Sequence, residues 1–321
     1  MRTNAVKKLM RVRPRGFCAG VVRAVEIVEL ALEAYGAPVY VHHEIVHNRY
    51  VVDQLRRRGA IFVESVLEVP EGSVLVFSAH GVPPEVRDQA SSRNMRVIDA
   101  TCPLVTKVHL EAVRFAREGR TIILIGHRDH QEIIGTSGEA PDRTLVVDSV
   151  EEVERLEVPD PDRLAFLTQT TLSMYDTQEI VAKLRDRFPT IVGPASDDIC
   201  YATQNRQEAV EHMAREVELI LVVGSANSSN SNRLVEVAKR DGVVARLIED
   251  ANDIKPEWLE GVKHVGLTAG ASAPEVLVEQ VSERLAALGF VDQEDRDLIR
   301  EDVRFTLPPE LVRLQTPTTG R

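Results

Sequence analysis

The chain has 321 residues, of which 43% are hydrophobic and 28% are charged, and its formal net charge is −11. This length allows two or three domains, and the acidic balance argues against general binding to nucleic acid or to an anionic membrane. No apolar stretch reaches the roughly 18 residues of a membrane span, and the residues before Cys18 hold no apolar signal core, so we expect a cytoplasmic protein.

Short apolar runs rich in valine and isoleucine alternate with amphipathic stretches along most of the chain. Continuous apolar runs favour buried parallel strands, and the spacing of apolar residues between them favours helices. The alternation therefore predicts an α/β fold with mainly parallel sheets. The predicted strands are 39–41, 74–77, 97–98, 121–125, 144–147, 164–167, 219–223, 243–248 and 264–267. Examples of the predicted helices are 21–34, 105–117, 176–188, 205–215, 230–240 and 274–288.

Glycine and proline residues suggest domain boundaries near residue 100 and near residues 193–197. We therefore predict three similar α/β units. They comprise residues 1–100, which include an N-terminal segment, then 101–197 and 198–290. The remaining residues, 291–321, are expected to form a tail that packs back onto the body through Phe305, Leu307 and Leu311.

Polar sequences follow five of the predicted strands. Because ligands of open α/β sheets bind at the carboxyl ends of the strands, these loops predict one shared central site. The loops read SAHG at 78–81, GHRDH at 126–130, TQTT at 168–171, GSANSSNSN at 224–232 and TAGAS at 268–272.

Three cysteines, Cys18, Cys102 and Cys200, are the only ones in the chain, and each stands between a strand-like and a helix-like run. An odd number in a reducing compartment argues against a disulfide framework. A buried, inert role is the ordinary alternative for a free cysteine, but the repeated context favours metal ligands. Structural zinc is disfavoured because no CxxC pair is present. Three soft ligands from three units suit an iron–sulfur cluster in which one iron lacks a protein thiolate.

Several histidines and one glutamate in or next to these loops are candidate functional residues. His47, His80 and His130 lie in three separate loops, and imidazoles suit phosphate binding and proton transfer near neutral pH. Glu132 follows two residues after His130 and is a candidate proton donor. The alternative is that Glu132 is an ordinary carboxylate in the first turn of a helix, where the helix dipole favours it.

The sequence GSANSSNSN leads from a predicted strand into a predicted helix and contains Ser228, Ser229 and Asn230. Small polar side chains and free amides at a helix N-terminus form an anion site, although a serine cap of the helix is the simpler alternative. TAGAS, with Ser272, offers a second set of amides, and TQTT, with Gln169 and Thr170, offers hydroxyls and an amide. Together the loops suit a small, strongly anionic ligand such as a diphosphate.

Nine motifs in order resemble 4-hydroxy-3-methylbut-2-enyl diphosphate reductase, the last enzyme of the methylerythritol phosphate route to isoprenoids, from about Arg13 to Leu288. They are RGFCAGVVRAV, EIVHNRYVVDQL, FSAHGV, DATCPLVTKV, GHRDHQEIIGTSGE, TQTTLS, DDICYATQNRQ, SANSSNSNRL and GLTAGASAPE. One departure is Gln131, where the family usually has proline.

The resemblance implies three α/β units in pseudo-threefold arrangement around a central 4Fe-4S cluster with one open iron. It implies that Cys18, Cys102 and Cys200 bind the cluster, that Glu132, Thr170 and His130 are catalytic, and that Gln169 neighbours them at the substrate's hydroxyl end. The diphosphate would be bound by His47, His80, His130, Ser228, Ser229, Asn230 and Ser272.

The implied reaction is the reductive dehydroxylation of (E)-4-hydroxy-3-methylbut-2-enyl diphosphate to isopentenyl diphosphate and dimethylallyl diphosphate. A ferredoxin or flavodoxin is implied as electron donor, since the chain has no nicotinamide or flavin motif. Two alternatives stay open. An iron–sulfur sensor that binds a phosphorylated effector would not need Glu132 or Thr170, and a non-redox hydro-lyase would consume no electrons.

Overall fold

The computed structural model describes residues 6–315, which form two compact units, each assembled from separate stretches of chain. Within the described residues, unit 1 comprises 6–18, 47–51 and 201–303. Unit 2 comprises 19–46, 52–200 and 304–315.

Unit 1 contains one five-stranded sheet with the strand order β10-β9-β11-β1-β12, in which every pair of neighbours is parallel. All residues of β9 are buried, as its sequence LILVV predicts for an interior strand covered on both faces. The strands are β1 (Lys8–Arg13), β9 (Leu219–Val223), β10 (Val244–Ile248), β11 (His264–Ala269) and β12 (Asp292–Asp297).

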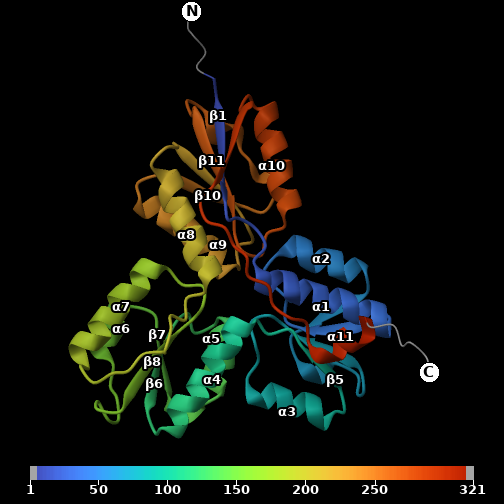
Figure 1. The fold of residues 1–321 in the computed structure, drawn as a ribbon, viewed down its shortest axis with the longest axis vertical. Helices are drawn as coiled ribbons and strands as arrows, with labels where there is room; N and C mark the ends of the chain where they lie inside the picture. Colours follow the sequence, from blue (N-terminus) through green and yellow to red (C-terminus); the bar gives the residue numbers. More distant parts are fainter. Residues whose placement is uncertain (1–5, 316–321) are drawn as a thin grey trace, which may run out of the picture. The chain divides into compact units, whose positions relative to one another are not determined.

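The two faces of this sheet are covered by different helices (Figure 1). Alternate residues of β9 point to opposite faces, as in any strand. Leu219, Leu221 and Val223 share a core with α10 (Glu275–Ala287). Ile220 and Val222 share a core with two other helices, α8 (Tyr201–Ala214) and α9 (Ser229–Arg240).

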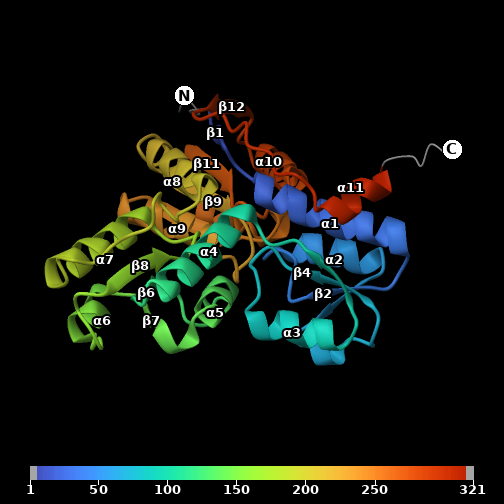
Figure 2. The same cartoon turned by 60° about the horizontal axis from the view of Figure 1, so that its bottom comes forward.

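The first sheet of unit 2 has the strand order β3-β2-β4-β5 and is again parallel throughout. One face packs against α3 (Pro84–Ser92) and the short 3₁₀ helix η1 (Val66–Glu68), and the other against α1 (Ala19–Tyr35) (Figures 1 and 2). The strands are β2 (Val39–His42), β3 (Ala60–Val63), β4 (Val74–Phe77) and β5 (Arg96–Asp99).

The second sheet of unit 2 has the order β7-β6-β8, with all pairs parallel. One face packs against α6 (Val150–Arg155) and α7 (Met174–Arg187), and the other against α4 (Pro103–Arg117) and α5 (Gln131–Gly138). The strands are β6 (Thr121–Ile125), β7 (Thr144–Val147) and β8 (Leu164–Thr168). The other elements are α2 (Arg49–Arg57), α11 (Pro309–Gln315) and three 3₁₀ turns at Pro141–Arg143, Ala251–Asp253 and Pro256–Leu259.

The α/β class with mainly parallel sheets is confirmed, and every predicted strand and helix is present with shifts at its ends. Several elements were missed, among them the apolar strand β3, whose sequence is AIFV. The clearest case is β12, whose sequence DQEDRD contains no apolar residue. It pairs in parallel with β1, and its acidic residues lie beside basic ones there: Arg11 pairs with Asp295 at 2.6 Å, Arg13 with Asp297 at 3.4 Å, and Lys8 with Glu294. The other missed elements are β1, β3, α2, α3, α5, α6 and α11.

The observed units differ from the predicted division at both ends of the chain. β1 was assigned to residues 1–100 and β12 to the tail, yet both lie in the sheet of unit 1 because they pair with each other and β1 pairs with β11. The last helix, α11, contacts α1 and buries Leu311, whereas Phe305 and Leu307 are half-buried. Among the described residues, none of the helices has the length and hydrophobicity to span a membrane.

Candidate functional site

Three loops of unit 1 gather at one edge of its sheet, because they follow the parallel strands β1, β9 and β11. The loop after β11 is bonded to both others. The Ala271 amide donates to the Asn230 side-chain oxygen at 2.8 Å, and the Ala271 carbonyl accepts from the Cys18 amide at 3.1 Å. A second backbone bond joins the Gly16 amide to the Ala269 carbonyl at 3.2 Å. The cysteine loop and the serine-rich loop are thus tied through one segment.

The segment that carries His47 is bound to the same edge of unit 1. The Ser272 hydroxyl donates to the His47 carbonyl at 2.9 Å. The Arg49 amide donates to the Ser225 hydroxyl at 3.2 Å, and the Asn227 side-chain nitrogen lies 3.5 Å from His47 Nδ1. The structure therefore brings together the unit 1 candidates, which are Cys18, His47, Ser228, Ser229, Asn230 and Ser272.

Ser228 is the N-cap of α9, so the capping alternative is correct for this residue. Its Oγ accepts from the Ser231 amide at 3.4 Å and from the Ser231 hydroxyl at 3.0 Å. Ser229 and Asn230 are not needed for the cap. Asn230 is 4% exposed, and besides its bond to Ala271 its side-chain nitrogen lies 3.4 Å from Thr203 Oγ1. A helix start with polar side chains beside a second loop is a suitable cradle for an anion.

Ser231 is enclosed by two glycines at this edge. A Cβ on Gly224 or on Gly270 would overlap the Ser231 side chain. Neither glycine has a positive φ, so the reason for glycine is close approach rather than backbone conformation. The ends of β9 and β11 can therefore lie directly against the first turn of α9.

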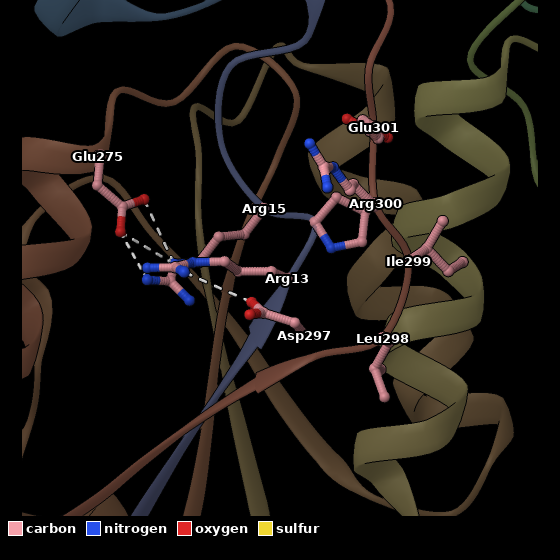
Figure 3. A pocket seen from close by; sticks show the side chains of 9 residues that line it. Arg13, Arg15, Glu275, Asp297, Leu298, Ile299, Arg300 and Glu301 are labelled. Atoms are coloured by element: carbon pink, nitrogen blue, oxygen red, sulfur yellow. Dashed lines mark hydrogen bonds and ion pairs between the residues drawn. The ribbon is translucent and has the colours of Figure 1, made fainter.

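A cavity of about 620 Å³ opens in unit 1 where β1 and β12 end (Figure 3). Its charged side chains are paired: Arg15 with Glu275 at 2.6 Å, and Arg13 with Asp297 at 3.4 Å. Because opposite charges balance on its walls, this cavity does not match the anion site that the loops predict.

Arg206 binds the loop of unit 1 that carries Cys18. It is fully buried, and its guanidinium donates to the Gly16 carbonyl at 2.8 Å and pairs with Glu301 at 3.0 Å. A buried cation needs such a partner. Sequence analysis did not identify this pair, and its members stand 95 residues apart.

In unit 2, Glu132 and Thr170 form a tight buried pair. Glu132 Oε2 accepts from both the amide and the hydroxyl of Thr170, each at 2.9 Å. The two residues are 5% and 4% exposed. Glu132 does lie in the first turn of α5, but its bonds go to the loop after β8, so it is more than a local helix carboxylate. Hydroxyl and carboxyl in contact can pass a proton along one path.

His130 caps the helix that carries Glu132. Its Nδ1 accepts from the Glu132 amide at 3.2 Å. With Nδ1 as acceptor, we assign the proton of the neutral ring to Nε2, which is then a donor. α5 begins at Gln131, the position where the family usually has proline, and His130 is its N-cap.

His80 lies beside His130 although the two follow strands of different sheets. Their ring centroids are 5.9 Å apart in an edge-on arrangement. Ser78 Oγ is 3.4 Å from His80 Nδ1, and His80 is 8% exposed. The loops after β4 and β6 thus meet within unit 2, as the prediction of a shared edge requires.

Both the oxygen and the nitrogen of the Gln169 side-chain amide form hydrogen bonds. Its oxygen accepts from the His127 amide at 3.1 Å, and its nitrogen donates to Thr171 Oγ1 at 2.8 Å. The first bond ties the loop after β6 to the loop after β8, and the second fixes the Gln169 side chain within its own loop. They fit a role in holding Glu132 and Thr170 in place.

Cys102 and Cys200 are each bonded through their backbone to another candidate loop of unit 2. The Cys102 amide donates to the Ala79 carbonyl at 2.9 Å, next to His80, and the Cys200 amide donates to the Thr170 carbonyl at 3.0 Å. Each of the three cysteines directly precedes a helix and is half-buried, and none is in a disulfide. The positive end of a helix favours the anionic form in which cysteine binds metals. Among the described residues, no group of three His, Cys, Asp or Glu side chains is close enough to hold a single metal ion.

Asp198 lies two residues before Cys200 and was not identified from the sequence. Burial raises the pKa of Asp198 to about 6, against the opposing effects of the Thr168 amide and the Lys107 ammonium. Its two oxygens accept from these groups at 3.0 and 3.2 Å.

A second overlooked network joins α3, α4 and α5. His109 Nδ1 and Arg87 Nη2 each lie 2.8 Å from Glu139 Oε1. The His109 ring is 4% exposed and fits between Gly81 and Gly135, where an added Cβ would stand about 3 Å from it. His109 therefore braces the loop of His80 against the helix of Glu132.

Comparison with known proteins identifies a family. The model of the family described as LytB protein matches residues 9–286. A protein of Aromatoleum aromaticum named 4-hydroxy-3-methylbut-2-enyl diphosphate reductase is 58% identical over 97% of this chain and 99% of its own length. The protein of that name from Streptomyces coelicolor is 57% identical over 98% of this chain and 93% of its own.

Solved structures give the same result. The E-1-hydroxy-2-methyl-but-2-enyl-4-diphosphate reductase of Plasmodium falciparum superposes with a TM-score of 0.92 at 40% identity, covering 96% of this chain and 98% of that one. A structure described as (E)-4-hydroxy-3-methyl-but-2-enyl diphosphate reductase, the terminal enzyme of the non-mevalonate pathway, has a TM-score of 0.62 at 34% identity. It covers 88% of this chain and 99% of that one.

Proposed function

The chain belongs to the LytB protein family, and on this premise we propose that it is a 4-hydroxy-3-methylbut-2-enyl diphosphate reductase. It converts the (E)-allylic alcohol diphosphate to isopentenyl diphosphate and dimethylallyl diphosphate, with two electrons and protons consumed and water released. The observation that carries the proposal is the buried Glu132–Thr170 pair, because a carboxyl and a hydroxyl joined at 2.9 Å suit protonation of a leaving hydroxyl group.

The diphosphate is bound by hydroxyl, amide and imidazole groups of the candidate loops. Support comes from the helix start at α9, the neighbouring TAGAS loop and the paired rings of His80 and His130. Neutral donors and imidazoles can hold a dense negative charge on a protein of net charge −11. The proposed ligands are His47, His80, His130, Ser228, Ser229, Asn230 and Ser272.

Cys18, Cys102 and Cys200 hold a 4Fe-4S cluster with one open iron. The donor set fits this group, since three thiols outside any disulfide, each before a helix start, are soft anionic ligands. When bound, the cluster supplies electrons one at a time and a Lewis acid for the substrate's hydroxyl end. The three α/β units are proposed to surround it in pseudo-threefold arrangement, as in the family that the motifs resemble.

The chain's own part in the reaction is to orient the substrate and deliver a proton. In the proposed relay a protonated Glu132 gives its proton to the Thr170 hydroxyl, which turns from donor to acceptor and passes its own proton to the substrate, while Gln169 keeps the two loops together. His130 fixes the start of α5 and so the position of Glu132. A ferredoxin or flavodoxin is the proposed electron donor, and the cytoplasm the proposed compartment.

The test is anaerobic turnover of the allylic diphosphate with a reduced viologen as donor. The proposal expects both isoprenoid diphosphates and two oxidised viologens per product. Substrate binding without product would instead support a sensor, and product formation without viologen oxidation would support a hydro-lyase.

A further inference from the structure

Lys107 connects the helix that begins after Cys102 with the segment that precedes Cys200. It lies on α4, and its ammonium group donates to the Ser196 carbonyl at 2.7 Å and the Asp197 carbonyl at 3.0 Å. It also donates to Asp198 Oδ1 at 3.2 Å. A lysine ammonium has three protons, so all three are used on one short segment.

The same segment is fixed at two further points of unit 2. Asp198 Oδ2 accepts from the Thr168 amide at 3.0 Å, at the end of β8. The Cys200 amide then donates to the Thr170 carbonyl at 3.0 Å. The position of Cys200 is therefore set by the strand end and by α4 together.

The pair of Lys107 and Asp198 is unlike the surface ion pairs of this chain. The Asp198 side chain is 0% exposed and that of Lys107 is 28% exposed. By contrast, Lys183 and Glu154 of unit 2 pair at 2.8 Å with side chains 33% and 54% exposed. Exposed pairs contribute little to stability, whereas removal of one partner from a buried pair leaves an uncompensated charge. Loss of Lys107 should therefore affect its partner segment more than loss of an exposed lysine such as Lys183 would affect its own.

We propose that Lys107 is a positioning residue that fixes the segment before Cys200 relative to α4, and so sets the spacing of the Cys102 and Cys200 thiols for the cluster. The inference rests on the proposed function, because it assigns the two thiols to one cluster. Lys107 would act through the segment before Cys200, to which all its bonds run.

The experiment compares Lys107→Met, Lys107→Arg and the surface control Lys183→Met in the anaerobically purified full-length chain. Two quantities are measured: amide hydrogen exchange of residues 196–200, and the rate at which iron is lost to a chelator. Lys107→Met should raise both rates by about tenfold or more, because about tenfold is the low end of the effect expected when charge-assisted hydrogen bonds are lost. Lys107→Arg should restore part of the protection, and Lys183→Met should match the wild type.

The result that overturns the inference is wild-type exchange or a wild-type rate of iron loss in Lys107→Met. Equal effects of Lys107→Met and Lys183→Met would also overturn it, since the effect would then not be specific to this segment. Failure of the proposed cluster is recognised separately, because the wild-type chain would then contain no iron and sulfide, while hydrogen exchange still reports whether Lys107 holds the segment.

Discussion

Replacing Glu132 with glutamine should abolish most turnover while the protein remains folded. Glutamine has nearly the same shape, and its side-chain oxygen can still accept the two bonds that Thr170 donates to Glu132 at 2.9 Å. The cost is largest for the ionised form of Glu132, because a neutral hydrogen bond contributes about 1 kcal/mol less than a charge-assisted one, so the two bonds cost at most about 2 kcal/mol of stability. A domain stability of about 5–15 kcal/mol tolerates that loss.

The effect on rate is expected to be larger than the effect on stability. An amide has no acidic proton to give, and loss of a general acid typically lowers the rate by about 10²–10⁴, or about 3–5 kcal/mol in the barrier. Anaerobic turnover with reduced viologen measures the rate, calorimetry with the allylic diphosphate measures binding, and thermal unfolding measures stability. We expect binding near the wild-type value together with the slow rate.

Glu139→Gln is the matched control, because Glu139 is a buried carboxylate at the other end of the same helix. Its side chain is 8% exposed and bonds His109 and Arg87 rather than Thr170. It should lose stability yet keep its turnover at temperatures where it is folded. The proton assignment is refuted if Glu132→Gln turns over near the wild-type rate, or if both variants slow equally.

Three further predictions concern the cluster, the anion site and pH. Cys102→Ser should lose most iron and sulfide after anaerobic purification, and a variant with full iron and full activity would remove this cysteine from the ligand set. Asn230→Ala should weaken binding of the allylic diphosphate by about ten- to a hundredfold in calorimetry; unchanged affinity would mean that the anion lies elsewhere. Burial raises the pKa of Glu139, but hydrogen bonds from His109 and Arg87 outweigh it, so the pKa lies below its usual value of about 4.5. The stabilisation that ionised Glu139 contributes is therefore fully present above about pH 4.5 and is lost as the pH falls further. The difference in unfolding free energy between the wild type and Glu139→Gln should shrink as the pH falls through that range. A difference that is constant with pH would contradict this account.

The sequence predicted those parts of the fold that leave a local signal. Buried strands such as Leu219–Val223 are continuous apolar runs, and the polar loops after them carry the candidate residues. The motif resemblance also paired Glu132 with Thr170, which the structure finds in direct contact. These features depend on a few neighbouring residues or on a family pattern.

What could not be predicted depends on partners far apart in the chain. The segment DQEDRD is a strand that pairs with β1 and its basic residues, and Lys107 meets Asp198 across 91 residues. No local pattern distinguishes Lys107 from an ordinary exposed lysine of an amphipathic helix. The cluster, its ligands and the three-unit arrangement remain proposals that rest on the family and on thiol chemistry.

The position of β1 has a consequence for how the protein is made on the ribosome. β1 is an interior strand, yet its neighbours β11 and β12 are synthesised long after it, and the pair Arg11–Asp295 spans 284 residues. At about 5–20 residues per second, β1 waits roughly 15–60 s for β12 to emerge. The sheets of unit 2 pair strands that are close in sequence and can form during that time. The cationic side chains of β1 help to keep it from pairing with other strands before then, so the nascent chain completes the sheet that holds the Cys18 loop only after β12 has been synthesised.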